Sequence, residues 1–268
     1  GEVVMIGALT ALTVIKLLAD SGLPGTVVVL IGLLAAIPVC MALGFTIERI
    51  AYRPLRNAPR LAPLITAIGV SIVLQQLAMI FWGRNYHAFP PILPTSSREI
   101  GGAHITDVQI VIILLAVAIM AGLMLLVNRT RLGRAMRATA ENPQIAGLMG
   151  VNINVIISAT FLIGSALAAV AGVMVSANYS IAHYHMGFIL GLKAFTAAVL
   201  GGIGNLPGAM LGGVLLGLIE SLGAGYIGDL TGGFLGSHYQ DVFAFFVLIL
   251  VLVFRPSGLM GEKVAERA

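Results

Sequence analysis

Three ionisable side chains lie inside otherwise apolar stretches of the sequence, namely Glu2, Lys193 and Glu220. A charge in an apolar medium is costly, so such groups usually face the interior of a helix bundle or a wet path through it. One interpretation of Lys193 is therefore a group that lines a translocation path or pairs with a carboxylate across the bundle. The other is a structural ion pair, or a long side chain that extends to the edge of the apolar layer. The sequence leaves both interpretations open.

Other patterns that could carry chemistry are incomplete. His183 and His185 could bind a metal ion together, but no cysteine or carboxylate stands close by to complete a site. The run GGIGNLPG lacks the Lys-Ser/Thr ending of a phosphate-binding loop, so nucleotide binding is not predicted. No G-x-S-x-G or H-E-x-x-H motif occurs in the sequence. We therefore expect no catalytic residue, no metal ion and no cofactor bound by this chain.

The same glycine-rich run stands between two apolar segments and suits a different role. Glycine and proline interrupt helices, and small residues allow helices in an apolar medium to approach closely. We interpret the run as a helix break between two packed half-helices rather than as a ligand-binding loop. The residues expected to form this break are Gly201, Gly202, Gly204, Pro207 and Gly208.

The elements that must position these residues are unusually apolar. Of the 268 residues, 59% are hydrophobic and 10% are charged, and the mean hydropathy is +1.02. A soluble domain carries roughly 25% charged residues, so this chain has too few to cover a surface in water. Its solvent is predicted to be lipid. The formal charge of +4 does not indicate nucleic-acid binding, because the basic residues are spread through short connections.

Long apolar runs recur along the whole chain. Several of them reach the ~20 residues that a helix needs to cross a bilayer, whereas the first and the last are shorter. They predict an all-α polytopic membrane protein that forms a single domain over residues 1–268, with about eight membrane segments that include short or broken helices. The segments are 3–18, 25–47, 61–82, 109–127, 155–177, 186–203, 208–227 and 241–254.

The basic residues are distributed unevenly between the connections. The connections 48–60 and 128–154 and the tail after residue 254 hold 11 of the 15 lysines and arginines. They alternate with connections that carry few basic residues. Because basic residues accumulate on the cytoplasmic side of membrane proteins, these segments and the C-terminus are predicted to be cytoplasmic.

The connection 131–150 (RLGRAMRATAENPQIAGLMG), here named the elbow, is predicted to be structured. Residues 132–141 suit one short amphipathic helix, and Asn142 and Pro143 suit the cap and the first position of a second helix. A structured segment of this length exceeds what membrane orientation requires, so we expect it to dock a soluble partner; a charged anchor is the alternative. The residues expected to serve this contact are Arg131, Arg134, Arg137, Glu141, Asn142, Pro143 and Ile145.

Three stretches of the chain resemble, in sequence and in order, the LivH-type permeases of branched-chain amino acid ABC importers: RLGRAMRATAENPQIAGLMGVNIN, GLKAFTAAVLGGIGNLPGAMLGG and FRPSGLMG. The resemblance implies a transport subunit, not an enzyme, in the bacterial inner membrane. Its implied partners are a second, homologous permease, two cytoplasmic ATPases that bind ATP and magnesium, and a periplasmic binding protein that delivers the amino acid. The elbow maps onto the segment that couples the family to its ATPases. The family also has a membrane segment before its GEVVMIG motif, and we expect that segment to be missing before Gly1.

Two alternatives stay open at this point. A permease of the same superfamily could carry urea, short amides or sugars, although a sugar site would need more intramembrane Asn, Gln and Asp than this chain has. A channel or an ion-gradient-driven secondary transporter belongs to another class. It predicts paired intramembrane carboxylates in symmetrical repeats, and it would leave the elbow without a purpose.

Overall fold

The computed structural model describes residues 1–56, 58–59, 61–90, 97–100, 103–202, 204–230, 240–255 and 257–261. The chain divides into two compact units, Gly1–Ile189 and Leu190–Ala268. Both units are built from apolar helices. That residues 1–268 form one permease domain stays a prediction.

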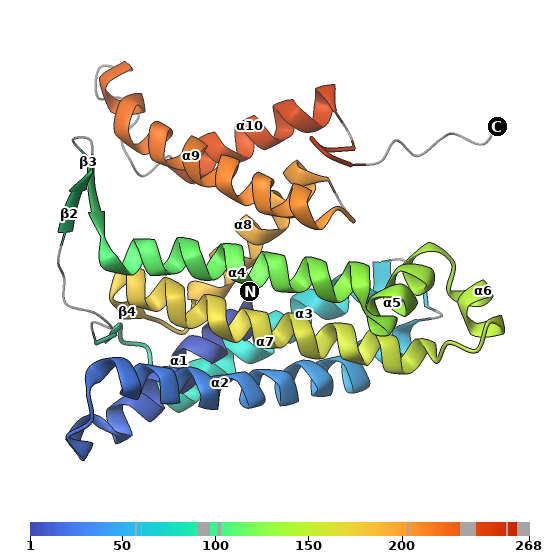
Figure 1. Ribbon diagram of the computed structural model, residues 1–268, viewed down its shortest axis with the longest axis horizontal. Coiled ribbons are helices and arrows are strands. Elements are labelled where there is room, and N and C mark those ends of the chain that lie inside the picture. The colour runs from blue at the N-terminus through green and yellow to red at the C-terminus, as the bar shows by residue number, and fades with distance from the viewer. Residues whose placement is uncertain are drawn as a thin grey trace. The chain divides into compact units, whose positions relative to one another are not determined.

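A helix coincides, to within a few residues, with each apolar segment predicted from the sequence (Figure 1). Among the described residues, five helical stretches are long and apolar enough to cross a membrane: 25–55, 61–82, 107–129, 153–179 and 206–226. The all-α membrane fold is therefore confirmed, whereas the count of eight membrane segments is not. The eight helices are α1 (Glu2–Leu17), α2 (Gly25–Ile47), α3 (Leu61–Trp82), α4 (Asp107–Arg129), α7 (Ile153–Tyr179), α8 (Met186–Gly201), α9 (Leu206–Leu230) and α10 (Gln240–Phe254).

The remaining elements lie in the connections. Two short helices, α5 (Arg131–Glu141) and α6 (Pro143–Leu148), join α4 to α7. A 3-10 turn, η1 (Ala19–Ser21), follows α1, and α2 continues into a π turn, η2 (Glu48–Tyr52), and a 3-10 turn, η3 (Arg53–Leu55). Strands β1 (His87–Ala88) and β4 (Ile181–Ala182) pair antiparallel, with His87 opposite Ala182. Strands β2 (Ser97–Ile100) and β3 (Ala103–Thr106) form a second antiparallel pair.

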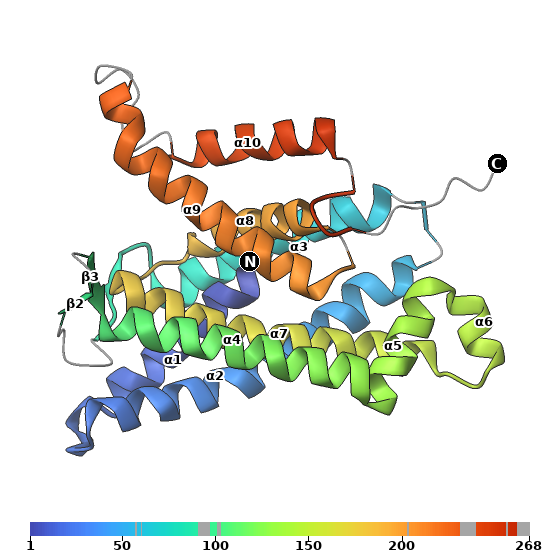
Figure 2. The same ribbon diagram turned by 45° about the horizontal axis from the view of Figure 1, so that its top comes forward.

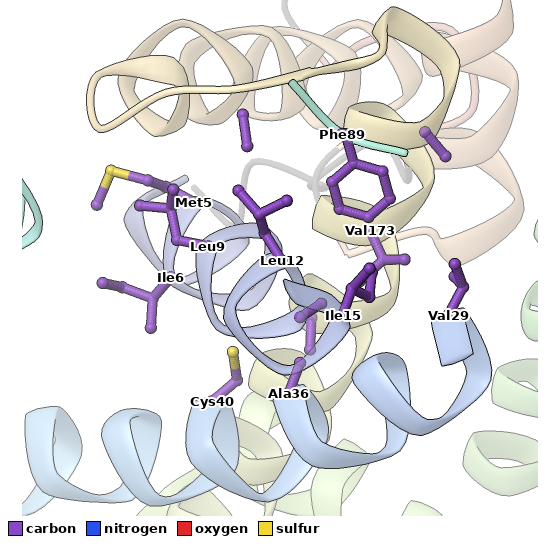
Figure 3. Close-up of a cluster of buried hydrophobic side chains, with 14 of the residues drawn as sticks. Met5, Ile6, Leu9, Leu12, Ile15, Val29, Ala36, Cys40, Phe89 and Val173 are labelled. Atoms are coloured by element: carbon purple, nitrogen blue, oxygen red, sulfur yellow. The ribbon is translucent and has the colours of Figure 1, made fainter. Parts of the chain in front are cut away.

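The core of the first unit forms where α1 packs between α2 and α7. Figure 3 shows Leu9 and Leu12 of α1 near Cys40 of α2 and Val173 of α7, and all of these side chains are buried. Lipid provides no hydrophobic force between helices, so close backbone contact must hold them together. Glycine provides it here, because a Cβ added at Gly172 of α7 would lie 2.1 Å from the carbonyl oxygen of Val4.

Helices α3 and α4 are largely apolar yet are scarcely buried. Within α4 no residue is buried, and within α3 only Leu74, Gln75 and Ala78 are. Large side chains such as Ile65 and Leu114 are 67% and 64% exposed. A soluble protein rarely exposes a continuous apolar surface of this kind, so these faces are suited to lipid or to another membrane subunit.

The tight contact between α1 and α7 leads to a first prediction. Gly172→Ala should lower the midpoint of thermal unfolding of the purified protein in detergent, because the new methyl group has no room beside Val4. Overpacking of this kind costs ~1–3 kcal/mol. Gly164→Ala is the matched control on the same helix, since a Cβ there would meet nothing within 4 Å. Equal midpoints for the two variants would contradict the packing argument.

Candidate functional site

The elbow stands at the end of the first unit where α4 finishes and α7 begins, as both views show (Figures 1 and 2). Thr130 caps α5, because its hydroxyl accepts a hydrogen bond from the backbone N–H of Gly133 (3.0 Å) and donates to the carbonyl of Leu126 (2.6 Å). A Cβ at Gly133 would lie 2.2 Å from the carbonyl oxygen of Val127. Helix α5 is therefore held directly against the end of α4.

Arg137 is exposed and also strengthens this attachment. Its Nη1 donates to the carbonyl of Val127 and to Oδ1 of Asn128, the latter over 3.2 Å. The last carbonyls of a helix lack intrahelical partners and carry partial negative charge, so a guanidinium suits this position. Arg131, Arg134 and Glu141 of the same helix are exposed.

The joint between α5 and α6 is fixed by one side chain. Oδ1 of Asn142 accepts hydrogen bonds from the backbone N–H groups of Gln144 (3.0 Å) and Ile145 (3.1 Å). Pro143 occupies the first helical position, where its missing N–H costs nothing. At the other end of α6, Gly150 has a φ of +85°, which glycine adopts without strain. The backbone N–H of Val151 then bonds to the carbonyl of Ala146 (3.0 Å).

The tip of the elbow is apolar. Ile145, Leu148 and Met149 are 58%, 87% and 80% exposed, and the charged residues of α5 stand on the neighbouring helix. An apolar centre with a polar rim is the usual composition of a protein–protein contact. Of these three apolar residues, only Ile145 was predicted from the sequence as a contact residue. Leu148 and Met149 were overlooked, although two large apolar side chains shortly after a charged helix, in a segment between two membrane-length apolar runs, are a usable signal.

A cluster of charges joins α8, α9 and α10. Nζ of Lys193, from α8, lies 3.0 Å from Oε2 of Glu220, from α9, and 2.8 Å from Oδ1 of Asp241, from α10. The structure thus brings together two of the predicted intramembrane residues. Asp241 was missed because it stands at the edge of the last apolar segment. Two carboxylates face one ammonium group, and Oε1 of Glu220 is buried without a hydrogen-bond partner.

Glu2 occupies a separate place in the first unit. It is 7% exposed, and its Oε1 accepts hydrogen bonds from the hydroxyl of Ser71 (2.7 Å) and from Nε2 of Gln75 (2.9 Å), both on α3. A Cβ at Gly187 would lie 2.4 Å from its Oε2, so the start of α8 passes close by. Glu2 is therefore held by neutral donors inside the bundle.

The glycine-rich run forms the turn between α8 and α9. Gly202 and Gly204 have φ values of +108° and +92°, and a Cβ at Gly201 would lie 2.0 Å from the carbonyl oxygen of Gly208. Pro207 lies in the first turn of α9. The segment after α10 returns to this turn, where the backbone N–H of Met260 bonds to the carbonyl of Gly201 (3.0 Å). Two stretches that are distant in the sequence are thus fastened to each other.

His183, in the connection between α7 and α8, takes part in packing. The ring of His183 stacks on that of Tyr86 with centroids 4.2 Å apart, and its Nε2 lies 3.3 Å from the carbonyl oxygen of Arg84. The pKa of His183 is lowered from its ordinary value, mainly by partial burial. The bond to the carbonyl of Arg84 raises this pKa, and the nearby His185 and His87 lower it further. Within the described part of the chain, no three His, Cys, Asp or Glu residues are grouped so that they could hold a metal ion.

Apolar helices with lipid-suited faces, charges paired between them and a capped pair of short helices at one end define a polytopic membrane protein. The chain belongs to the family described as "Branched-chain amino acid transport system / permease component", which it matches over residues 1–252. This confirms the resemblance seen in the sequence and makes the chain a transport subunit.

Curated relatives match the chain over its length. The high-affinity branched-chain amino acid transport system permease protein BraD of Pseudomonas aeruginosa is 47% identical over 100% of this chain and 86% of its own length. The corresponding permease protein LivH of Escherichia coli K12 is 42% identical over the same shares. A probable LivH of Methanocaldococcus jannaschii is 27% identical over 97% of this chain and 81% of its own length. No solved structure matches the chain.

The charge cluster of the second unit gives a second prediction. Lys193→Met should lower the thermal stability of the protein in detergent by ~1–3 kcal/mol, because it leaves two carboxylates close together without a cation; partial exposure keeps this cost below that of a fully buried pair. The triple variant Lys193→Met, Glu220→Gln, Asp241→Asn should recover most of the loss, since no charge is then unpaired. A triple variant less stable than Lys193→Met would contradict this account of the cluster.

Proposed function

We propose that the chain is the membrane-spanning permease subunit of an ATP-driven importer in the bacterial inner membrane. Its substrate is a branched-chain or other hydrophobic amino acid, which a periplasmic binding protein delivers. The observation that carries this proposal is the identity of 47% over the whole chain to BraD, which is named as a permease protein of a branched-chain amino acid transport system. A second, homologous permease pairs with this chain, and the exposed apolar faces of α3 and α4 offer surface for it.

The energy for import comes from two cytoplasmic ATPases, because the sequence has no phosphate-binding loop of its own. ATP and magnesium are bound by those subunits. The ATPases must then act on the permease through a protein contact, and the elbow has the features of one. The exposed Ile145, Leu148 and Met149 fit an apolar groove, while Arg131 and Arg134 provide charges beside it.

The elbow is suited to transmit a displacement because its joints are held by hydrogen bonds. Thr130 fixes the start of α5, Arg137 ties α5 to α4, and Asn142 sets the angle between α5 and α6. A flexible loop at this place would absorb the motion of the ATPase instead of passing it on. We therefore assign the elbow to coupling and place it in the cytoplasm.

We also assign Glu2, Lys193 and Glu220 to the interior of the helix bundle, not to lipid. Each of them contacts polar side chains of a neighbouring helix, which supports this assignment. The helix break at 201–208 then serves packing. Its glycines let α8 and α9 approach closely at the end where the segment 257–261 is fastened.

The third prediction tests coupling in proteoliposomes that contain the assembled complex, with ATP inside and loaded binding protein outside. Replacing residues 142–147 by a Gly-Ser linker should abolish ATP-driven uptake of radiolabelled leucine, because the rigid tip is lost. Leu148→Ser should lower uptake about tenfold, the effect of losing one central apolar contact. Leu23→Ser is the control, since Leu23 is an exposed leucine in the connection between α1 and α2 and should leave uptake unchanged.

Two results would count against the proposal, each against a different part. Normal uptake by an assembled complex with the linker would make the elbow a charged anchor only. If the unaltered complex moved no branched-chain amino acid although loaded binding protein stimulated its ATP hydrolysis, the proposed substrate would be wrong and the importer assignment would stand.

The fourth prediction concerns orientation and uses the Cys40→Ala background, in which the native buried cysteine is absent. In cells with a permeabilised outer membrane, Tyr86→Cys should react with an impermeant thiol reagent, because Tyr86 is 72% exposed in an outer connection. Ala140→Cys, in the exposed part of α5, should react only after the inner membrane is disrupted. Labelling of Ala140→Cys in intact cells would reverse the proposed topology, with its cytoplasmic elbow and cytoplasmic C-terminus.

A further inference from the structure

Glu48 is a charged residue with no exposed surface, at the point where α2 passes into the π turn η2. Both of its carboxylate oxygens are occupied. Nη2 of Arg56 donates to Oε1, and the hydroxyl of Ser158 donates to Oε2 over 2.7 Å. Nη1 of the same arginine donates to Oδ1 of Asn154. These four residues, here named the Glu48 network, join the cytoplasmic end of α2 to α7. From the sequence alone, Glu48 and Arg56 were interpreted only as charged residues of the connection 48–60, and their pairing was not predicted.

The two residues of the Glu48 network on α7, Asn154 bonded to Arg56 and Ser158 bonded to Glu48, stand directly after the elbow. Asn154 is the second residue of α7, and Ser158 follows one turn later. Only residues 149–152 separate α6 from α7, and they are fixed at both ends. The backbone N–H of Val151 bonds to the carbonyl of Ala146 (3.0 Å), and Oδ1 of Asn152 caps α7 by accepting from Val155 N–H (3.3 Å). A displacement of the elbow therefore has little slack before it reaches Asn154.

The end of α2 is attached to α7 at two further places. A Cβ at Gly44, one turn before Glu48, would lie 1.8 Å from Oγ of Ser165, so the helices touch there. One turn after Glu48, the rings of Tyr52 and Phe161 lie 5.4 Å apart. A π turn adds a residue to the helical turn and is frequent at functional positions. Here it stands at the level of Glu48.

We propose that Glu48 is a positioning residue that carries displacement of the elbow from α7 into α2, an inference that rests on the proposed coupling function of the elbow. An apolar contact would resist separation of the two helices but would tolerate sliding. The ion pair of Glu48 and Arg56 receives two directional hydrogen-bond contacts from α7, through Ser158 and Asn154, so these three bonds hold one register of the two helices. Fixed geometry is what such ion pairs supply better than stability. The network thus makes the elbow, α7 and the end of α2 move together.

The test measures leucine molecules imported per ATP hydrolysed, in proteoliposomes of the whole complex. The double variant Glu48→Gln, Arg56→Gln keeps the shape of Glu48, shortens Arg56 to a neutral amide and leaves no unpaired charge, so the complex should assemble. Its transport ratio should fall about fivefold, the low end of coupling between distant sites. Ser158→Ala, which removes one hydroxyl, should lower the ratio in the same direction. A residue needed only for folding would reduce the amount of complex and leave the ratio unchanged.

Matched controls lie on the same two helices. Thr160→Val deletes an exposed hydroxyl of α7 that bonds only to the carbonyl of Ile156, and Arg49→Gln deletes an exposed charge of η2. Both should keep the unaltered ratio. The inference is overturned if the assembled double variant couples normally; if that variant does not assemble, a normal ratio for Ser158→Ala overturns it. A variant with a Gly-Ser linker in place of residues 142–147 separates the two proposals. A normal transport ratio in this linker variant refutes coupling by the elbow. A low ratio in the linker variant, together with normal ratios in the variants of the Glu48 network, refutes only the role of Glu48.

Discussion

Lipid cannot donate or accept hydrogen bonds, so every polar group that the chain places among its apolar helices must find a partner within the protein. Most of the described polar side chains follow this constraint in two ways, whereas Oε2 of Glu2 and Oε1 of Glu220 are buried without a hydrogen-bond partner. Hydroxyl groups of Thr13, Thr46, Thr160 and Thr196 donate to the carbonyl four residues earlier in their own helices. Charged side chains reach across to another helix instead, and these cross-helix bonds decide which helices are neighbours.

Lipid also removes the hydrophobic force that packs helices in soluble proteins, and close contact at glycine replaces part of that force. In the first unit, Gly7 and Gly172 bring α1 and α7 into backbone contact, and Gly44 of α2 leaves room for the side chain of Ser165 of α7. In the second unit, Gly201 and Gly212 bring α8 and α9 together. Because a Cβ at each of these glycines would overlap the neighbouring helix, the helices that carry them have few ways to pack.

Sequence reasoning succeeds where the signal is local. Apolar runs locate the helices because each must bury its own backbone polar groups, and Asn142–Pro143 sets the start of α6 because a cap needs only its own next turn. Pairings between helices depend on the tertiary fold. Hence Asp241 was not expected beside Lys193, and Arg137, placed on a polar face by its spacing, turns back to the end of α4. The number of segments that cross the membrane was not fixed either, because α1, α8 and α10 are only 15–16 residues long.

The charged groups inside the bundle differ in how their charge is balanced, and this difference bears on what each can do. Glu48 and Arg56 are one anion and one cation. Both oxygens of Glu48 accept a hydrogen bond, and Arg56 also donates to Asn154, so the arrangement has a single low-energy geometry. Lys193 lies within bonding distance of two carboxylates, so α8 stays connected to the other helices of its unit when one contact lengthens. A joint that must keep its register needs the first kind of contact. A place where helices shift against each other tolerates the second kind, such as the contacts of Lys193. We therefore assign the transmission of motion to the pair of Glu48 and Arg56, which stands beside the elbow.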